Sequence, residues 1–160
     1  MGSFASGTTV SQEKSRQEIE TLLVKSGASR FGCITDIVDR RAMIGFTYQG
    51  LQIQMEVPLP DPAARAFTHD HRHCRRSETK AAELYQAEMR RRWRCLALAL
   101  KAKLVAVGDG VTTFEREFLS YVVAADGNTI GEKLMPVLEH AKNGGGMVPA
   151  SLALPPGGGA

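Results

Sequence analysis

The residues best suited to bind an anion are the arginines and lysines near the middle of the chain. Residues 88–95 read EMRRRWRC, with four arginines around Trp93. Guanidinium groups donate several hydrogen bonds in a geometry that suits phosphate oxygens. Residues 65–103 hold 11 Lys and Arg against 4 Asp and Glu, whereas the rest of the chain holds 9 against 13. A basic centre of this kind favours a nucleic acid or a nucleotide as partner.

Seven cationic residues are the candidates for nucleic-acid or nucleotide binding: Arg72, Arg75, Arg76, Arg90, Arg91, Arg94 and Lys101. On a helical wheel Arg90, Arg94 and Lys101 share one side, while Arg92 and Lys103 lie on another, so the charges do not form one compact patch. In the alternative interpretation the arginines surround an apolar helix face and pair with neighbouring acids.

Trp93 and Glu88 bear on the choice between these interpretations. The tryptophan could stack on a base, as aromatic residues do in single-strand binding sites. Its position inside an apolar stripe at helical spacing instead favours a core anchor. Glu88 is the nearest acid with which the arginines could pair.

A metal ion is a second ligand that the residue types allow. The candidates are His69, His71, His73 and Cys74, because alternate residues of an extended chain point the same way. Structural zinc sites normally take ligand pairs from two separated places, and His140 stands alone elsewhere. Flanking arginines also oppose a cation. We therefore expect a solvated basic loop and no metal or other cofactor.

Catalytic signatures are weak throughout the sequence. The chain has no nucleophile-elbow sequence, no GxGxxG motif and no phosphate loop ending in Lys-Ser/Thr. Glu115 and Glu117 are two residues apart on a short predicted helix and therefore face different ways. A non-enzymatic protein is expected, with an enzyme that uses the His69–Cys74 loop as a further alternative.

Composition sets the broad class. A chain of 160 residues is about one domain, and its apolar and charged fractions of 43% and 23% are those of a soluble globular protein. An odd count of three cysteines suggests no disulfide framework and favours a reducing compartment. Because neither a signal peptide nor a run long enough to span a bilayer is evident, the cytoplasm is expected and a membrane is not.

The order of the predicted elements indicates the fold class. A helix follows Ser11 and ends near Gly27, and three strands follow at 30–35, 42–48 and 51–57, the last with strict alternation. An exposed basic loop, 58–77, leads to a long helix that lacks proline and glycine, 78–107. Two short helices are then predicted from the capping-box spacings that begin at Thr112 and Thr129, the second kinked at Pro136.

Segregated helices and strands of this kind predict an α+β fold, with a three-stranded antiparallel meander covered by the long helix. We expect a flexible arm at 1–10, a single domain at 11–142 and a flexible Gly/Pro-rich tail at 143–160. The free edges of such a small sheet would favour self-association, so a homo-oligomer is among the expected states.

Several segments resemble a family of small, uncharacterised proteins encoded by bacteriophages and prophages. The shared strings include EKSRQEIETLL, GASRFG, VPLPDP, RAFTH, RRWRCLALALKAKL, TTFEREF and DGNTIGEKLMPVLE, and the similarity covers about residues 10–154. Members of that family tend to have glycine and proline at the positions of His71, Arg72 and His73. The resemblance implies a phage accessory protein in the cytoplasm of a bacterial host, with no functional residues to carry over.

Two hypotheses of function follow. In the first, the protein binds nucleic acid through the basic loop and the first turns of the long helix. In the second, it is an anti-defence or host-takeover protein that binds and inhibits a host protein or sequesters a nucleotide signal. The difference between them is whether the cationic side chains form an extended track or line a small concave site.

Overall fold

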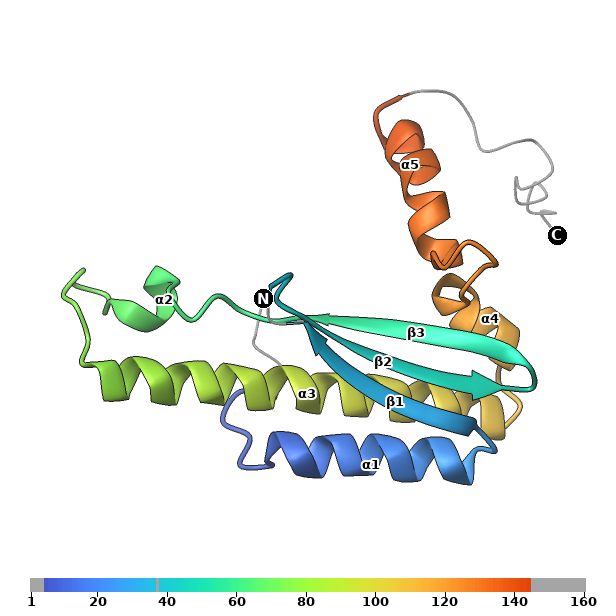
Figure 1. The fold of residues 1–160 in the computed structure, drawn as a ribbon, viewed down its shortest axis with the longest axis horizontal. Helices are drawn as coiled ribbons and strands as arrows, with labels where there is room; N and C mark the ends of the chain where they lie inside the picture. The colour runs from blue at the N-terminus through green and yellow to red at the C-terminus, as the bar shows by residue number, and fades with distance from the viewer. Residues whose placement is uncertain (1–4, 37, 145–160) are drawn as a thin grey trace, which may run out of the picture.

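The computed structural model describes residues 5–36 and 38–144 (Figure 1). The first residues of the predicted arm and most of the predicted tail, 145–160, lie outside the described residues. The described part has the predicted α+β architecture: a helix, a three-stranded antiparallel sheet, a long helix and short C-terminal helices. No helix within it combines the length and apolar character needed to cross a bilayer.

The sheet is a meander in which β1 (Ser29–Asp36), β2 (Arg41–Tyr48) and β3 (Leu51–Pro58) pair in order. The β2–β3 turn has positive φ at both central residues, Gln49 and Gly50, which suits the right-handed twist of a hairpin. Alternate residues of β2 and β3 are buried, including Ile44, Phe46, Ile53 and Met55. The predicted alternation is therefore confirmed, with one face of the sheet turned to the core.

The long helix α3 (Glu78–Gly108) begins after Ser77, whose side chain accepts a hydrogen bond from the Lys80 backbone. Its C-terminal part runs along the sheet, and its N-terminal turns extend beyond it (Figure 1). The buried stripe comprises Met89, Trp93, Ala97, Leu100 and Leu104. Trp93 is only 1% exposed, so its role as a core anchor is the one that the structure supports.

A second helix shares the covering of the sheet. α1 (Gln12–Lys25) lies beside α3 and runs in the same direction (Figure 1). The Arg16 guanidinium stacks over the Trp93 ring, 4.3 Å from its centroid, and Ile19 and Leu23 are buried in the same core. The predicted packing of the long helix on the sheet is therefore confirmed, and α1 joins α3 in the helical layer.

The C-terminal part begins with α4 (Phe114–Phe118) and the short 3-10 helix η1 (Leu119–Tyr121). Thr113, not Thr112, caps α4 by accepting a hydrogen bond from the Arg116 backbone, so this predicted capping position is wrong by one residue. Phe114 and Phe118 are buried against the sheet, where Phe114 stacks on Tyr48.

The last helix, α5 (Ile130–Lys142), projects away from the body (Figure 1). The predicted capping box is confirmed, because Thr129 and Glu132 exchange hydrogen bonds between side chain and backbone, and Pro136 lies inside the helix. At its base, Gly131 approaches the Ser120 carbonyl so closely that an added Cβ would lie 2.7 Å from the oxygen. The base of α5 is therefore packed closely against η1, whereas no residue of the helix itself is buried.

Candidate functional site

The predicted basic loop is more ordered than its composition indicates. It contains one helical turn, α2 (Arg65–Thr68), followed by a tight hairpin in which His69 and Arg75 form a β-bridge. The Asp70 carboxylate organises this hairpin by accepting hydrogen bonds from the backbone of Arg72 at 2.8 Å and of Cys74 at 2.9 Å. Such side-chain closure of a turn is typical of aspartate. The segment predicted as an exposed basic loop, 58–77, therefore contains a helical turn and a closed hairpin.

The hairpin does not assemble the metal candidates. The His69 ring nitrogen Nδ1 lies 2.9 Å from the Thr68 hydroxyl, whereas His71, His73 and Cys74 are exposed. Across residues 5–36 and 38–144, no three His, Cys, Asp or Glu side chains come together to hold an ion. The turn conformation is the reason, because it abolishes the extended geometry that would align alternate side chains.

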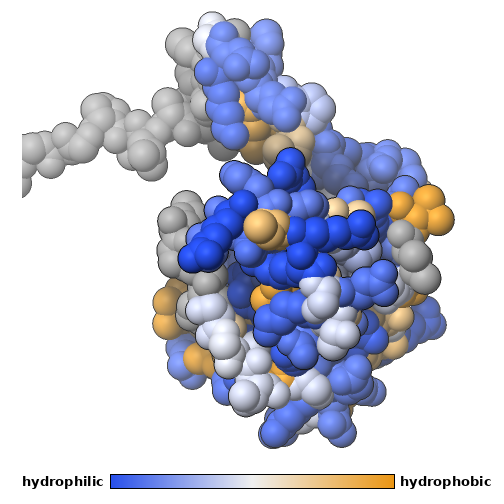
Figure 2. All heavy atoms as spheres, turned by 90° about the vertical axis from the view of Figure 1, so that its left-hand side faces the viewer, coloured by the Kyte–Doolittle hydropathy of each residue, from blue (hydrophilic) through white to orange (hydrophobic). Residues whose placement is uncertain are grey.

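The three loop arginines have different environments. Arg76 donates to the backbone carbonyls of Ala66 at 2.9 Å and Phe67 at 3.1 Å, so it satisfies the end of α2. Arg72 and Arg75 are exposed. Figure 2, which looks at this end of the molecule, shows mainly hydrophilic side chains around a few apolar ones. The loop therefore presents positive charge, but one of its arginines has a structural role.

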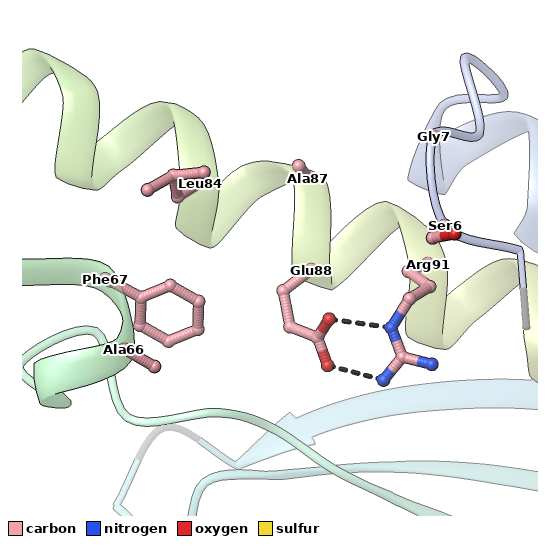
Figure 3. A pocket seen from close by; sticks show the side chains of 8 residues that line it. All are labelled: Ser6, Gly7, Ala66, Phe67, Leu84, Ala87, Glu88 and Arg91. Atoms are coloured by element: carbon pink, nitrogen blue, oxygen red, sulfur yellow. Dashed lines mark hydrogen bonds and ion pairs between the residues drawn. The ribbon is translucent and has the colours of Figure 1, made fainter. Parts of the chain in front are cut away.

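Arg91 is held by an acid from its own helix (Figure 3). Its Nε and one terminal nitrogen donate to the two oxygens of Glu88, each at 2.7 Å, and Arg92 Nε donates to the same carboxylate at 2.9 Å. These hydrogen bonds hold the pKa of Glu88 at about 2. Arg92 also donates to the Pro58 carbonyl. The alternative interpretation, in which the arginines pair with neighbouring acids, thus holds for Arg91 and Arg92.

Hollows flank this cluster on two sides. One, of about 270 Å³, is formed between the N-terminal residues, α2 and α3, and its lining is drawn in Figure 3. The other, of about 360 Å³, lies between the C-terminal end of β3 and the middle of α3, and is mostly apolar. Arg91 lines both hollows, with Glu88 holding its guanidinium at the boundary.

The remaining candidates lie on the other side of α3, where it meets α1. Arg90, Arg94 and Lys101 follow one another at helical spacing on α3, and Arg94 pairs with Glu18 of α1. Because the two helices are parallel, the lysines Lys14 and Lys25 of α1 lie alongside these α3 residues. The set that we call the cationic seam consists of five residues: Lys14, Lys25, Arg90, Arg94 and Lys101.

The seam is a shallow surface groove with a surplus of positive charge. A hollow of about 440 Å³ is lined by Lys14, Lys25 and Lys101. Glu18 is the one carboxylate among the described residues that line it, so this hollow has a net charge of +2. Arg94 pairs with Glu18, and Arg90 lines separate hollows, one of them together with Glu83. Arg94 and Glu18 are 23% and 29% exposed, which leaves their ion pair open to solvent from the groove.

The seven candidates are therefore sorted into three places by the structure. Arg90, Arg94 and Lys101 share the seam, Arg72, Arg75 and Arg76 lie on the hairpin, and Arg91 faces the two hollows. Sequence reasoning missed Lys14 and Lys25. Their spacing of 11 residues on α1 matches that of Arg90 and Lys101 on α3, and this equal spacing was the only sequence signal that could have paired them.

No protein-family model, no curated protein and no solved structure matches the chain.

Proposed function

We propose that the protein is a non-enzymatic nucleic-acid-binding protein and that the nucleic acid lies along the cationic seam. The observation that carries this proposal is the row of cationic side chains along the junction of two parallel helices, in which three lysines share one hollow with a single acid. An accessory role in a phage-infected bacterial cell would agree with the resemblance noted in the sequence.

The dimensions of the seam suit an extended polyanion. From Arg90 to Lys101 the helix rises about 16 Å at 1.5 Å per residue. Phosphates along one strand of B-DNA recur about every 3.4 Å of helix axis, so this length is that of about five phosphates. An open groove of this kind gives access along its whole length, whereas a nucleotide pocket would enclose its ligand. The track-like arrangement therefore favours a polymer over a nucleotide signal.

The chemistry of the seam predicts binding to the backbone without sequence preference. Lysine and arginine contacts to phosphate carry no base information. Trp93, the aromatic residue nearest to the arginines in sequence, is buried and cannot stack on a base. We therefore expect strong salt dependence and similar affinities for unrelated sequences.

Fluorescence anisotropy with a labelled DNA duplex, titrated over a series of NaCl concentrations, tests this proposal. In the double variant K14Q/K101Q, the slope of log Kd against log salt should fall by about 1.8, since each lost phosphate contact removes about 0.9. The matched control R116Q/K142Q removes the same charge from exposed positions off the seam. Its salt slope should stay close to that of the unmodified protein.

Two outcomes would overturn the proposal. Absence of binding to duplex and single-stranded DNA and RNA at low salt would exclude nucleic acid as the partner. Equal losses in K14Q/K101Q and in R116Q/K142Q would show that binding follows net charge alone and that the seam is not the site.

A further inference from the structure

The cationic seam consists of two rows of side chains, one on each helix. Lys14 and Lys25 form the α1 row, whereas Arg90, Arg94 and Lys101 form the α3 row. The ends of each row are 11 residues apart, a spacing that returns a helix to within about 20° of its starting direction. Each row therefore keeps to one side of its helix over a rise of about 16 Å.

Two contacts between the helices place the rows at the same height. Gln12 Nε2 donates to Gln86 Oε1 at 3.1 Å, and Arg94 pairs with Glu18. Positions on α1 are therefore level with positions 74 to 76 residues later on α3. This offset sets the two ends of the α1 row beside the two ends of the α3 row. The four end residues thus mark the corners of a strip along the junction of the helices.

The four corner cations are available to an anionic ligand. They are Lys14, Lys25, Arg90 and Lys101, and none of them forms an ion pair with another described residue. Glu18 pairs with Arg94, and Glu83 pairs with a lysine of its own helix. Glu13 and Glu20, the other acids of α1, lie at least about 100° round the helix from the row. Between the ends of its row, α3 has no acid.

Two rows at this separation match two phosphate backbones. Packed helices have axes about 8–10 Å apart. The minor groove of B-form DNA is about 6 Å wide and the major groove about 12 Å, and the phosphate groups that border a groove lie somewhat farther apart than its width. Rows on neighbouring helices can therefore contact both backbones across a minor groove, which is the closer match of the two.

Single strands and A-form RNA match the strip less well. Proteins that bind single strands without sequence preference offer aromatic side chains on which the bases stack. The described residues that line the hollows along the seam include no aromatic residue. The minor groove of A-form RNA is wide and shallow, so two closely spaced rows would reach only one of its backbones.

We propose that the seam straddles the minor groove of B-form DNA, with the α1 row on one phosphate backbone and the α3 row on the other. This inference rests on the proposed function and adds the class of nucleic acid, a DNA duplex, together with contact to both strands. All contacts are to phosphate, so they carry no information about the bases.

Neutralising one strand of the duplex tests the contact to both backbones. The probe pairs one natural DNA strand with one strand of uncharged methylphosphonate linkages, and binding is measured by anisotropy over the NaCl series. A protein that contacts one backbone can choose the natural strand. It should keep about four fifths of its salt slope, because the slope per contact falls from about 0.9 to about 0.7. Contact to both backbones should reduce the slope to about two fifths, because half of the contacts are also lost.

The double variant K14Q/K25Q, which lacks the α1 row, is the matched control. Both lysines are exposed, so the variant should keep its fold. With one row left, it should lose only about a fifth of its salt slope when one strand is neutralised. For the unmodified protein, affinity for the natural duplex should exceed that for single-stranded DNA or for an RNA duplex on the order of tenfold, since half of the contacts would be absent.

Three results would overturn the inference and leave nucleic-acid binding itself intact. The first is equal affinity for duplex DNA and for single-stranded DNA or an RNA duplex. The second is a salt slope on the half-neutral duplex that stays near four fifths of its value on natural DNA. The third is a K14Q/K25Q variant that loses as large a share of its slope as the unmodified protein. Failure to bind any nucleic acid at low salt would instead remove the proposed function, and this inference with it.

Discussion

Replacing Glu88 by glutamine should destabilise the protein in a pH-dependent way. The carboxylate accepts hydrogen bonds from Arg91 and Arg92, and its pKa is lowered from 4.5 to about 2. A shift of this size corresponds to at most about 3 kcal/mol, at 1.36 kcal/mol per pKa unit. The three side chains are 21% to 28% exposed, so solvent screening reduces the expected contribution to about 1–2 kcal/mol.

The sign of the pH dependence follows from the direction of the shift. A carboxyl group whose pKa is lower in the folded state adds stability above its unfolded pKa, here 4.5, and loses it as pH falls through the folded value, about 2. Urea unfolding of the unmodified protein and of E88Q should therefore differ by about 1–2 kcal/mol at pH 7. The difference should shrink steadily between pH 4.5 and pH 2.

The comparison isolates one residue, because every other carboxylate is present in both proteins and its titration cancels. E83Q is the matched control, since Glu83 forms an exposed i,i+3 pair with Lys80 and should contribute little. A difference between E88Q and the unmodified protein that stays constant from pH 7 to pH 2 would refute the reasoning. It would show that the shape of the side chain, and not its charge, holds the two arginines.

Three further predictions concern the seam, the core and the base of α5. E18Q should strengthen DNA binding and raise the salt slope by about 0.9, because it frees Arg94 for phosphate; an anisotropy titration in which affinity falls would contradict this. Trp93→Ala should cost about 3–5 kcal/mol in urea unfolding, since it empties a buried core position, and a loss below about 1 kcal/mol would disprove the core role. G131A should speed amide hydrogen exchange in α5 because the new methyl group would press on the Ser120 carbonyl, whereas unchanged exchange would mean that this contact does not set the helix.

The sheet and the long helix could be predicted because their signals are local. Strict alternation of apolar and polar residues in 51–57 predicts a strand with one solvent-exposed face. A run of 30 residues without glycine or proline predicts a long helix. Capping chemistry placed the start of α5 correctly. It placed the start of α4 one residue early because Thr112 and Thr113 are neighbours, and only the structure shows which hydroxyl meets the Arg116 backbone.

The candidate site was harder to predict because its parts come from separate elements. In the sequence, Lys14 and Lys25 cannot be distinguished from other surface lysines. They join the candidate site only because α1 packs parallel to α3, which brings them beside Lys101. The pairing of Arg91 with Glu88 follows from a spacing of three residues and was foreseen as an alternative. Hairpin closure by Asp70 was missed, since a basic stretch without periodicity gives no sign that one carboxylate organises it.

The length of α3 affects how the size of this protein should be measured. With 31 residues, the helix is about 46 Å long at 1.5 Å per residue. It carries the segment after α2 at one end, while α4 and the base of α5 lie near its other end (Figure 1). An elongated particle diffuses and tumbles more slowly than a sphere of the same mass. A single chain would therefore elute early from a sizing column and could be mistaken for a pair, so only a measurement independent of shape can count the chains.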